Sequence, residues 1–141
     1  SICVYDKKMR KVQFAGAYNP VYVVRKANGE SEESVENQRE IVKFSGDRMP
    51  IGIYTKETPF RNREIQLEKD DIVYMFSDGF PDQFGGERNE KFKQKRFRNL
   101  LLNNSAKNME EQCEIIEQAF MQWKGDNDQI DDILVLGFRC G

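Results

Sequence analysis

The sequence contains no histidine among its 141 residues. This absence excludes catalysis by a Ser-His-Asp triad or a Cys-His pair within the chain. It also removes the side chain that most transition-metal sites use as a ligand. Any metal ion bound here would be held by oxygen atoms, which favours Mg²⁺, Mn²⁺ or Ca²⁺.

Cysteine is scarce and widely spaced, with Cys3, Cys113 and Cys140 as the only members. No two of them form a Cys-x-x-Cys pair, so neither a disulfide framework nor a zinc site is expected. A reducing compartment is the expected environment, and we therefore predict a cytoplasmic protein.

No apolar run is long enough to span a bilayer, and no excess of one charge is present. The 22 basic and 24 acidic residues leave a net charge of −2, and 38% of the residues are hydrophobic. This balance suits one globular domain and predicts no binding to nucleic acid and no membrane contact. The chain opens at Ser1 without a methionine or a signal peptide, so we expect a piece of a longer protein.

The sequence is organised around an apolar run at residues 72–76, which stops at Ser77, Asp78 and Gly79. Such a run predicts a strand buried on both faces that delivers one carboxylate at its end. At the other end of the chain the order is reversed, because Asp131 and Asp132 precede an apolar run at residues 133–138. If the two strands are adjacent and antiparallel, Asp78 and Asp131 converge.

Each of these motifs also has an ordinary structural interpretation. An Asp-Gly pair after a strand is usually a simple turn, and paired acids before a strand are usually solvated. The position of Asp78 after a fully apolar strand, beside a glycine that permits a sharp turn, favours a functional site. The adjacent carboxylates of Asp131 and Asp132 repel one another unless a cation lies near them, and Mg²⁺ or Mn²⁺ would meet that need.

Periodicity predicts an α+β fold in which consecutive strands with short links form antiparallel sheets. Residues 27–39 and 79–90 are expected to be loops. Residues 109–124 show the clearest helical pattern, with Asn108 as N-cap and Gly125 as the stop. The stripe of this helix contains Cys113 and Trp123, and residues 93–102 form a second helix. The expected strands cover residues 1–6, 11–17, 21–25, 40–44, 65–68, 72–76 and 133–138.

Three further features have alternative interpretations. The basic run from Arg88 to Arg98 could meet phosphate or nucleic acid, or be the solvent face of a helix. The segment with Phe80 and Phe84 could border a substrate cleft, or anchor its loop by hydrophobic contacts. The residues after Gly125 resemble the start of an EF-hand loop, but the required glycine and glutamate are missing, so calcium is disfavoured.

Taken together, the motifs resemble the bacterial SpoIIE-type (PP2C-like, PPM) serine/threonine phosphatase domain. The match extends in order and spacing through all 141 residues. The residues that carry it are 14–22, 49–53, 71–80, 84–85 and 131–133.

The resemblance implies an antiparallel β-sandwich flanked by helices, seen here as a C-terminal part with about seven strands and two helices. It implies metal-dependent hydrolysis of phosphoserine or phosphothreonine on a regulatory protein in bacterial signal transduction. Carried over to this sequence, the metal ligands for Mn²⁺ or Mg²⁺ are Asp78 and Asp131, with Asp132 as a weaker third ligand, and Gly79 belongs to the cofactor-binding site. Two metals would hold and ionise a bridging water.

The sequence departs from the family pattern at its start, because the upstream aspartate, Asp-Gly and Gly-His motifs are not present. Those motifs supply the remaining ligands, so the two-metal site is expected to be incomplete and the fragment itself to be inactive. Lys93 and Leu134 also differ from the usual glycine and threonine. The resemblance further implies an upstream sensor domain in the parent chain. The alternative function is a non-catalytic PP2C-like module for protein–protein regulation.

Overall fold

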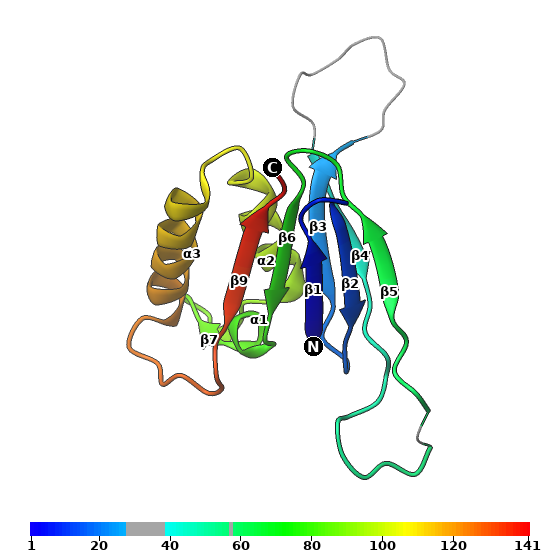
Figure 1. Ribbon diagram of the computed structural model, residues 1–141. Helices are drawn as coiled ribbons and strands as arrows, with labels where there is room; N and C mark the ends of the chain where they lie inside the picture. The colour runs from blue at the N-terminus through cyan, green and yellow to red at the C-terminus, as the bar shows by residue number, and fades with distance from the viewer. Residues whose placement is uncertain (28–38, 57) are drawn as a thin grey trace. The chain divides into compact units, whose positions relative to one another are not determined.

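The computed structural model describes residues 1–27, 39–56 and 58–141, and the loop expected at residues 27–39 lies almost entirely outside them. The described residues form two compact units (Figure 1). The first comprises Ser1–Met75 and Gly137–Gly141, and the second comprises Phe76–Leu136. The elements follow one another as β1 (Ile2–Asp6), β2 (Lys11–Ala15), β3 (Val21–Lys26), β4 (Arg39–Phe44), β5 (Arg63–Gln66), β6 (Ile72–Phe76), α1 (Gly79–Asp82), β7 (Phe84–Gly85), β8 (Glu90–Lys91), α2 (Gln94–Asn103), α3 (Met109–Lys124) and β9 (Val135–Arg139).

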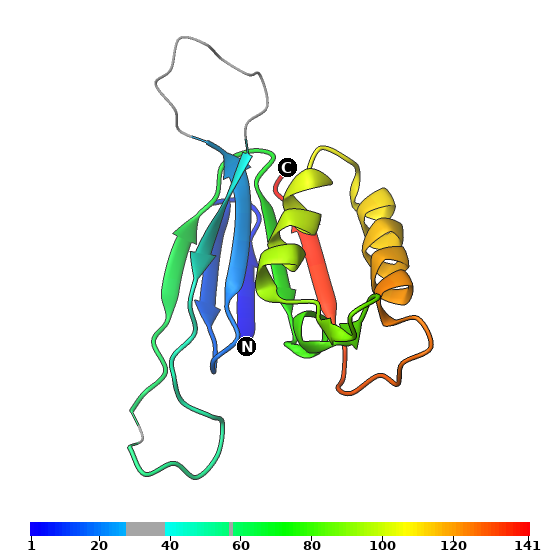
Figure 2. The same cartoon turned by 180° about the vertical axis from the view of Figure 1, so that it is seen from behind.

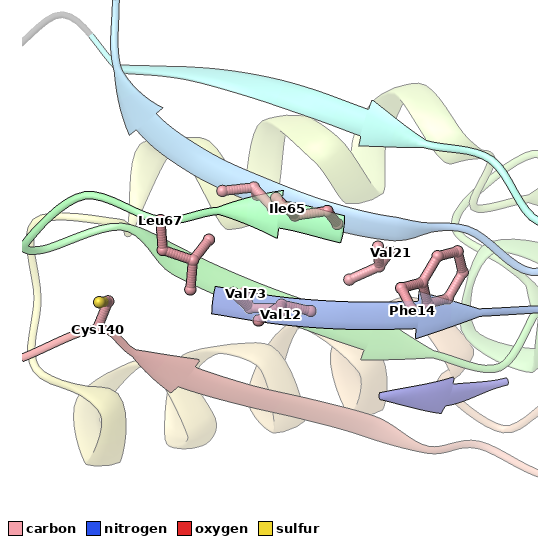
Figure 3. Close-up of a cluster of buried hydrophobic side chains, with 8 residues drawn as sticks. Val12, Phe14, Val21, Ile65, Leu67, Val73 and Cys140 are labelled. Atoms are coloured by element: carbon pink, nitrogen blue, oxygen red, sulfur yellow. The ribbon is translucent and has the colours of Figure 1, made fainter. Parts of the chain in front are cut away.

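Two antiparallel sheets build the first unit. One has the strand order β1-β2-β5, and the other has the order β4-β3-β6-β9. Their shared core contains Val12 and Phe14 from one sheet and Val21 and Val73 from the other (Figure 3). The alternation in β2 explains this placement, because Val12 and Phe14 are buried while Gln13 between them is exposed.

The central strands β3 and β6 lie inside their sheet, and both are apolar on both faces. The four residues Val21 to Val24 are at most 1% exposed, and so are Ile72 to Tyr74. The register pairs Val21 with Met75 and Val24 with Ile72. Burial raises the pKa of Tyr74 to about 12, because ionising a phenol away from water is costly. This confirms the interpretation of residues 72–76 as a strand buried on both faces.

A buried ion pair fixes the turn that leads into β6. Asp71 is 2% exposed, and its carboxylate accepts hydrogen bonds from Arg25 Nη2 at 2.8 Å and from the Glu68 N–H at 3.0 Å. Asp71 and Cys140 also bond through their main chains, at 2.7 Å. The entry to β6 is thereby held to β3 and to the end of the chain after β9.

The second unit is built around aromatic rings. Phe80 from α1 lies 5.0 Å from Phe92, 5.0 Å from Phe97 in α2 and 5.2 Å from Phe120 in α3, measured between ring centroids. The helices α2 and α3 also contact one another (Figure 2, where α3 is the helix shaded from yellow to orange). Unit 2 therefore has an apolar core of its own.

Helix α3 has the predicted bounds and the predicted N-cap. The Asn108 side chain accepts a hydrogen bond from the Glu111 N–H, and the Glu111 carboxylate accepts one from the Asn108 N–H. This reciprocal capping box satisfies two otherwise free donors at the helix start. The stripe prediction is wrong at Cys113, which is exposed, whereas the neighbouring Gln112 is 1% exposed.

The predicted α+β class with antiparallel sheets is confirmed, and the seven predicted strands correspond to β1–β6 and β9. The prediction of a plain loop at residues 79–90 is wrong. That segment contains α1 and the strand β7, which pairs with β8. These pieces are too short to show a periodicity, and the aromatic core of the unit orders them.

The basic residues between Arg88 and Arg98 lie on the solvent-exposed side of β8 and the first turns of α2. Lys93 and Arg96 both pair with Glu90, at 2.7 and 2.6 Å. Arg96 also stacks over the ring of Trp123, 4.6 Å from its centroid. With Phe97 and Leu101 buried on the opposite side of the helix, this arrangement favours the solvent-face interpretation of the run.

Candidate metal centre

The candidate site lies where β6 ends and β9 begins. Ser77 N–H donates to the Leu134 carbonyl at 3.0 Å, while Asp71 and Cys140 are bonded at the other end of the same two strands. A strand pair bonded in this order runs antiparallel, which is the arrangement required for Asp78 and Asp131 to converge. The structure therefore brings the 77–79 turn beside the residues that follow Asp131.

The Ser77 hydroxyl makes two hydrogen bonds that connect these two segments. It donates to the Asp132 carbonyl at 2.8 Å and accepts a hydrogen bond from the Leu134 N–H at 2.9 Å. The sequence motif around Ser77 does not by itself predict this role. A hydroxyl at the end of a buried strand was the available signal, because it can both donate and accept.

Gly79 is required by close packing. A Cβ built on it would overlap the carbonyl oxygen of Asp132 and lie 3.1 Å from Cγ1 of Ile133. From the sequence, Gly79 is predicted to permit a sharp turn. The structure instead shows that its missing side chain lets the Asp132 main chain approach.

The three carboxylates predicted as metal ligands are all exposed at this junction. Asp78 is the N-cap of α1, and its side chain makes no capping hydrogen bond. One oxygen of Asp131 accepts the Asp132 N–H at 2.7 Å. Among the described residues, no ion pair involves Asp78, Asp131 or Asp132. Their carboxylate oxygens are thus accessible for a cation.

These donors fit a hard divalent cation in chemical type but do not complete its coordination. Carboxylate oxygens are the ligands that Mg²⁺ and Mn²⁺ prefer. However, the described part of the chain contains no group of three or more acidic, thiol or imidazole side chains placed to hold a metal ion. A site at this junction would need oxygen donors besides these carboxylates.

The two aromatic residues after Asp78, Phe80 and Phe84, differ in their exposure to solvent. Phe80 is 1% exposed and sits in the aromatic core, so the interpretation of this ring as an exposed cleft residue is wrong. Phe84 is 38% exposed. The hydrophobic-anchor interpretation is thus confirmed for Phe80.

Comparison with known proteins decides the family. The profile described as Stage II sporulation protein E (SpoIIE) matches residues 1–141. The chain belongs to the SpoIIE family. No curated protein matches it significantly.

Solved structures similar to this SpoIIE-family chain include two PP2C domains. The SiaA-PP2C domain of Pseudomonas aeruginosa has 31% sequence identity and a TM-score of 0.75 over 95% of this chain. The PP2C phosphatase domain of SpoIIE from Bacillus subtilis, solved with a fragment of its regulatory domain, has 16% identity and a TM-score of 0.63 over 97%. The second likeness concerns the fold alone.

The chain spans about half of the SiaA domain, 48% of its length, and 36% of the SpoIIE structure. It is therefore similar to part of a PP2C-like domain. The SpoIIE family is one of PP2C-type serine/threonine phosphatases, which are typically metal-dependent. No helix among the described residues is long and apolar enough to cross a membrane.

Proposed function

We propose that the protein containing this chain is a metal-dependent phosphatase that hydrolyses phosphoserine or phosphothreonine on a regulatory protein in bacterial signalling. The observation that supports this proposal is the pair of Ser77 hydroxyl hydrogen bonds, which joins the segment containing Asp78 to the main chain of Asp132 and Leu134. Family membership and the likeness to the SiaA domain support it.

The chain's own residues would act by presenting oxygen donors from two segments. Asp78 and Asp131 would bind Mn²⁺ or Mg²⁺, with Asp132 as a third ligand and Gly79 keeping the segments in contact. When bound, such metals supply a hydroxide nucleophile at neutral pH and stabilise the phosphoryl oxygens during in-line displacement. Hydrogen bonds to main-chain atoms hold the two segments, so the backbone that carries the carboxylates would need little rearrangement.

The remaining donors would come from residues that have no counterpart in this chain, which covers 48% of the SiaA domain. We further propose a cytoplasmic location. The thiols of Cys3, Cys113 and Cys140 are all free, which suits a reducing compartment.

The test is Mn²⁺-dependent hydrolysis of a phosphoserine peptide by the protein and by its Asp78→Asn and Asp131→Asn variants. Each substitution removes one anionic oxygen donor. Loss of an outer-shell partner already lowers metal affinity or activity about 10–100-fold, so we expect at least a comparable loss in kcat/KM at limiting Mn²⁺.

Asp126→Asn serves as the matched control, because Asp126 is an exposed acid in the same connection between α3 and β9. It should retain the activity of the unmodified protein. Equal rates for all four proteins would refute the assigned ligand roles. Absence of Mn²⁺-dependent hydrolysis in the unmodified protein would favour the alternative function, a non-catalytic regulatory module.

A further inference from the structure

Gln83 is a wholly buried amide next to the candidate metal centre. Its exposed fraction is 0%, and it is the C-cap of α1, the four-residue helix that begins directly after Asp78. Its side-chain Nε2 donates to the Asp128 carbonyl at 2.9 Å and to the Phe84 carbonyl at 3.1 Å. The first of these bonds reaches the acidic loop, which we define as residues 126–132.

The main chain of Gln83 is itself held from several sides. Its carbonyl accepts hydrogen bonds from the Phe92 N–H at 2.9 Å and from the Trp123 Nε1–H at 3.0 Å, and its N–H donates to the Phe80 carbonyl at 3.3 Å. These hydrogen bonds fix the main chain of Gln83, and so they also fix the position from which its side-chain amide reaches Asp128.

The acidic loop has little structure of its own, because residues 126–132 contain neither helix nor strand. In Figures 1 and 2 this orange segment passes along the same end of its unit as α1 and β7. Lys124 and Asn127 hold its start through bonds of 2.6 and 2.9 Å, and Ser77 holds its end at Asp132. Between these two points, the Gln83 side chain bonds to the carbonyl of Asp128, which lies three residues before Asp131.

The hydrogen-bonding capacity of the buried Gln83 amide is only partly satisfied. Burying an amide is costly unless its hydrogen bonds are replaced. Gln83 Oε1 is buried and has no hydrogen-bond partner among the described residues. A leucine of similar volume would remove that cost at Oε1, but it would leave the Phe84 and Asp128 carbonyls without this donor. What leucine cannot supply is the bond to the acidic loop.

We propose that Gln83 is a positioning residue that holds the acidic loop, and with it Asp131, in register with Asp78. This proposal rests on the proposed function, in which both aspartates bind a divalent cation. The helix α1 connects Asp78 to Gln83, and the Gln83 amide continues the connection to Asp128. The two ligand segments are thus joined on one side by Ser77 and on the other by Gln83.

The first test measures Mn²⁺ affinity by calorimetry for the unmodified protein and for Gln83→Leu. Outer-shell residues that orient ligands typically contribute about 10–100-fold to metal affinity, and we expect Gln83→Leu to weaken Mn²⁺ binding by such a factor. The matched control is Gln112→Leu. Gln112 is also buried in this unit, at 1% exposure, and its Nε2 donates to the Lys107 carbonyl at 2.7 Å, away from the acidic loop.

A merely structural role would lower the unfolding temperature of both leucine variants and leave Mn²⁺ affinity equal in both. That outcome would overturn the proposal. A loss of affinity confined to Gln83→Leu, with Gln112→Leu binding as the unmodified protein does, would support it.

The second test follows a signal of the unmodified protein and so does not depend on how Gln83→Leu folds. Trp123 is the only tryptophan among these 141 residues, and loss of its signal in a Trp123→Phe variant assigns its indole N–H in the NMR spectrum of the protein. Since that N–H bonds to Gln83, we expect Mg²⁺ to shift the signal in the unmodified protein but not in Asp131→Asn. An unshifted signal at Mg²⁺ concentrations that saturate the site would refute the coupling.

The two proposals fail in different ways. If the unmodified protein hydrolyses the phosphopeptide with Mn²⁺ but Gln83→Leu retains full Mn²⁺ affinity, only the role of Gln83 is refuted. If the unmodified protein binds neither Mn²⁺ nor Mg²⁺, the metal roles of the aspartates and the inference about Gln83 are both refuted.

Discussion

Substituting Gly79 by alanine tests the geometry of the junction most directly. The added methyl group would overlap the Asp132 carbonyl oxygen and lie 3.1 Å from Ile133 Cγ1. Carbon atoms pack at about 3.5–4.0 Å, so relief requires the two segments to separate by on the order of 1 Å. The Ser77 Oγ to Asp132 oxygen distance, now 2.8 Å, would then exceed the hydrogen-bonding range.

The magnitude follows from two contributions. Overpacking by one methyl group costs about 1–3 kcal/mol, and loss of one hydrogen bond costs about 0.5–1.5 kcal/mol. We therefore expect Gly79→Ala to lower the free energy of unfolding by roughly 2–4 kcal/mol and to weaken Mn²⁺ binding. Urea unfolding followed by circular dichroism measures the first effect, and calorimetry measures the second.

The control is Gly46→Ala, which introduces a comparable clash in the other unit, against the carbonyl oxygen of Gly16. It should lower stability by a similar amount while leaving the link between Ser77 and Asp132 intact. The reasoning fails if Gly79→Ala matches the unmodified protein in both measurements, or if the two variants lose Mn²⁺ affinity equally.

Two further predictions concern the second unit. Phe80→Ala should cost about 3–5 kcal/mol of unfolding free energy in urea, because it empties the centre of the aromatic core, whereas Phe84→Ala should cost under about 1 kcal/mol. Similar losses for both would contradict the assigned core. Salt bridges to Lys93 and Arg96 lower the pKa of Glu90 from 4.5 to about 2. Because this pKa is depressed in the folded state, the stabilisation is complete above about pH 4.5 and disappears as the pH falls towards 2. Melting curves should show Glu90→Gln less stable than the unmodified protein at pH 7 and equally stable near pH 2, with Glu87→Gln as control; a gap independent of pH would contradict this.

Much of the fold could be predicted from the sequence, because the relevant signals are local. The bounds of α3 follow from its helical periodicity, the Asn108 cap and the Gly125 stop. The identity of β6 follows from its unbroken apolar run and the turn after it. These features depend on neighbours within a few residues, so reading the chain in order was sufficient.

For the candidate site, the sequence predicts which residues take part but not the contacts that bring their segments together. The oxygen-only character of any metal centre followed from the absence of histidine, and the family motifs selected Asp78 and Asp131. Why these segments meet did not follow, because the Ser77 hydroxyl bonds to a carbonyl 55 residues away. The short α1 and the burial of Phe80 also depended on rings supplied by α2 and α3.

The sequence by itself determined that this is an antiparallel α+β chain with carboxylates after one apolar strand and before another. Only the tertiary structure decided that Gly79 serves the close approach of Asp132, and that Gln83 is an interior anchor. The physical reason is that hydrogen bonds and close contacts depend on distance in space. Gln83 and Asp128 are 45 residues apart in the chain but bonded at 2.9 Å.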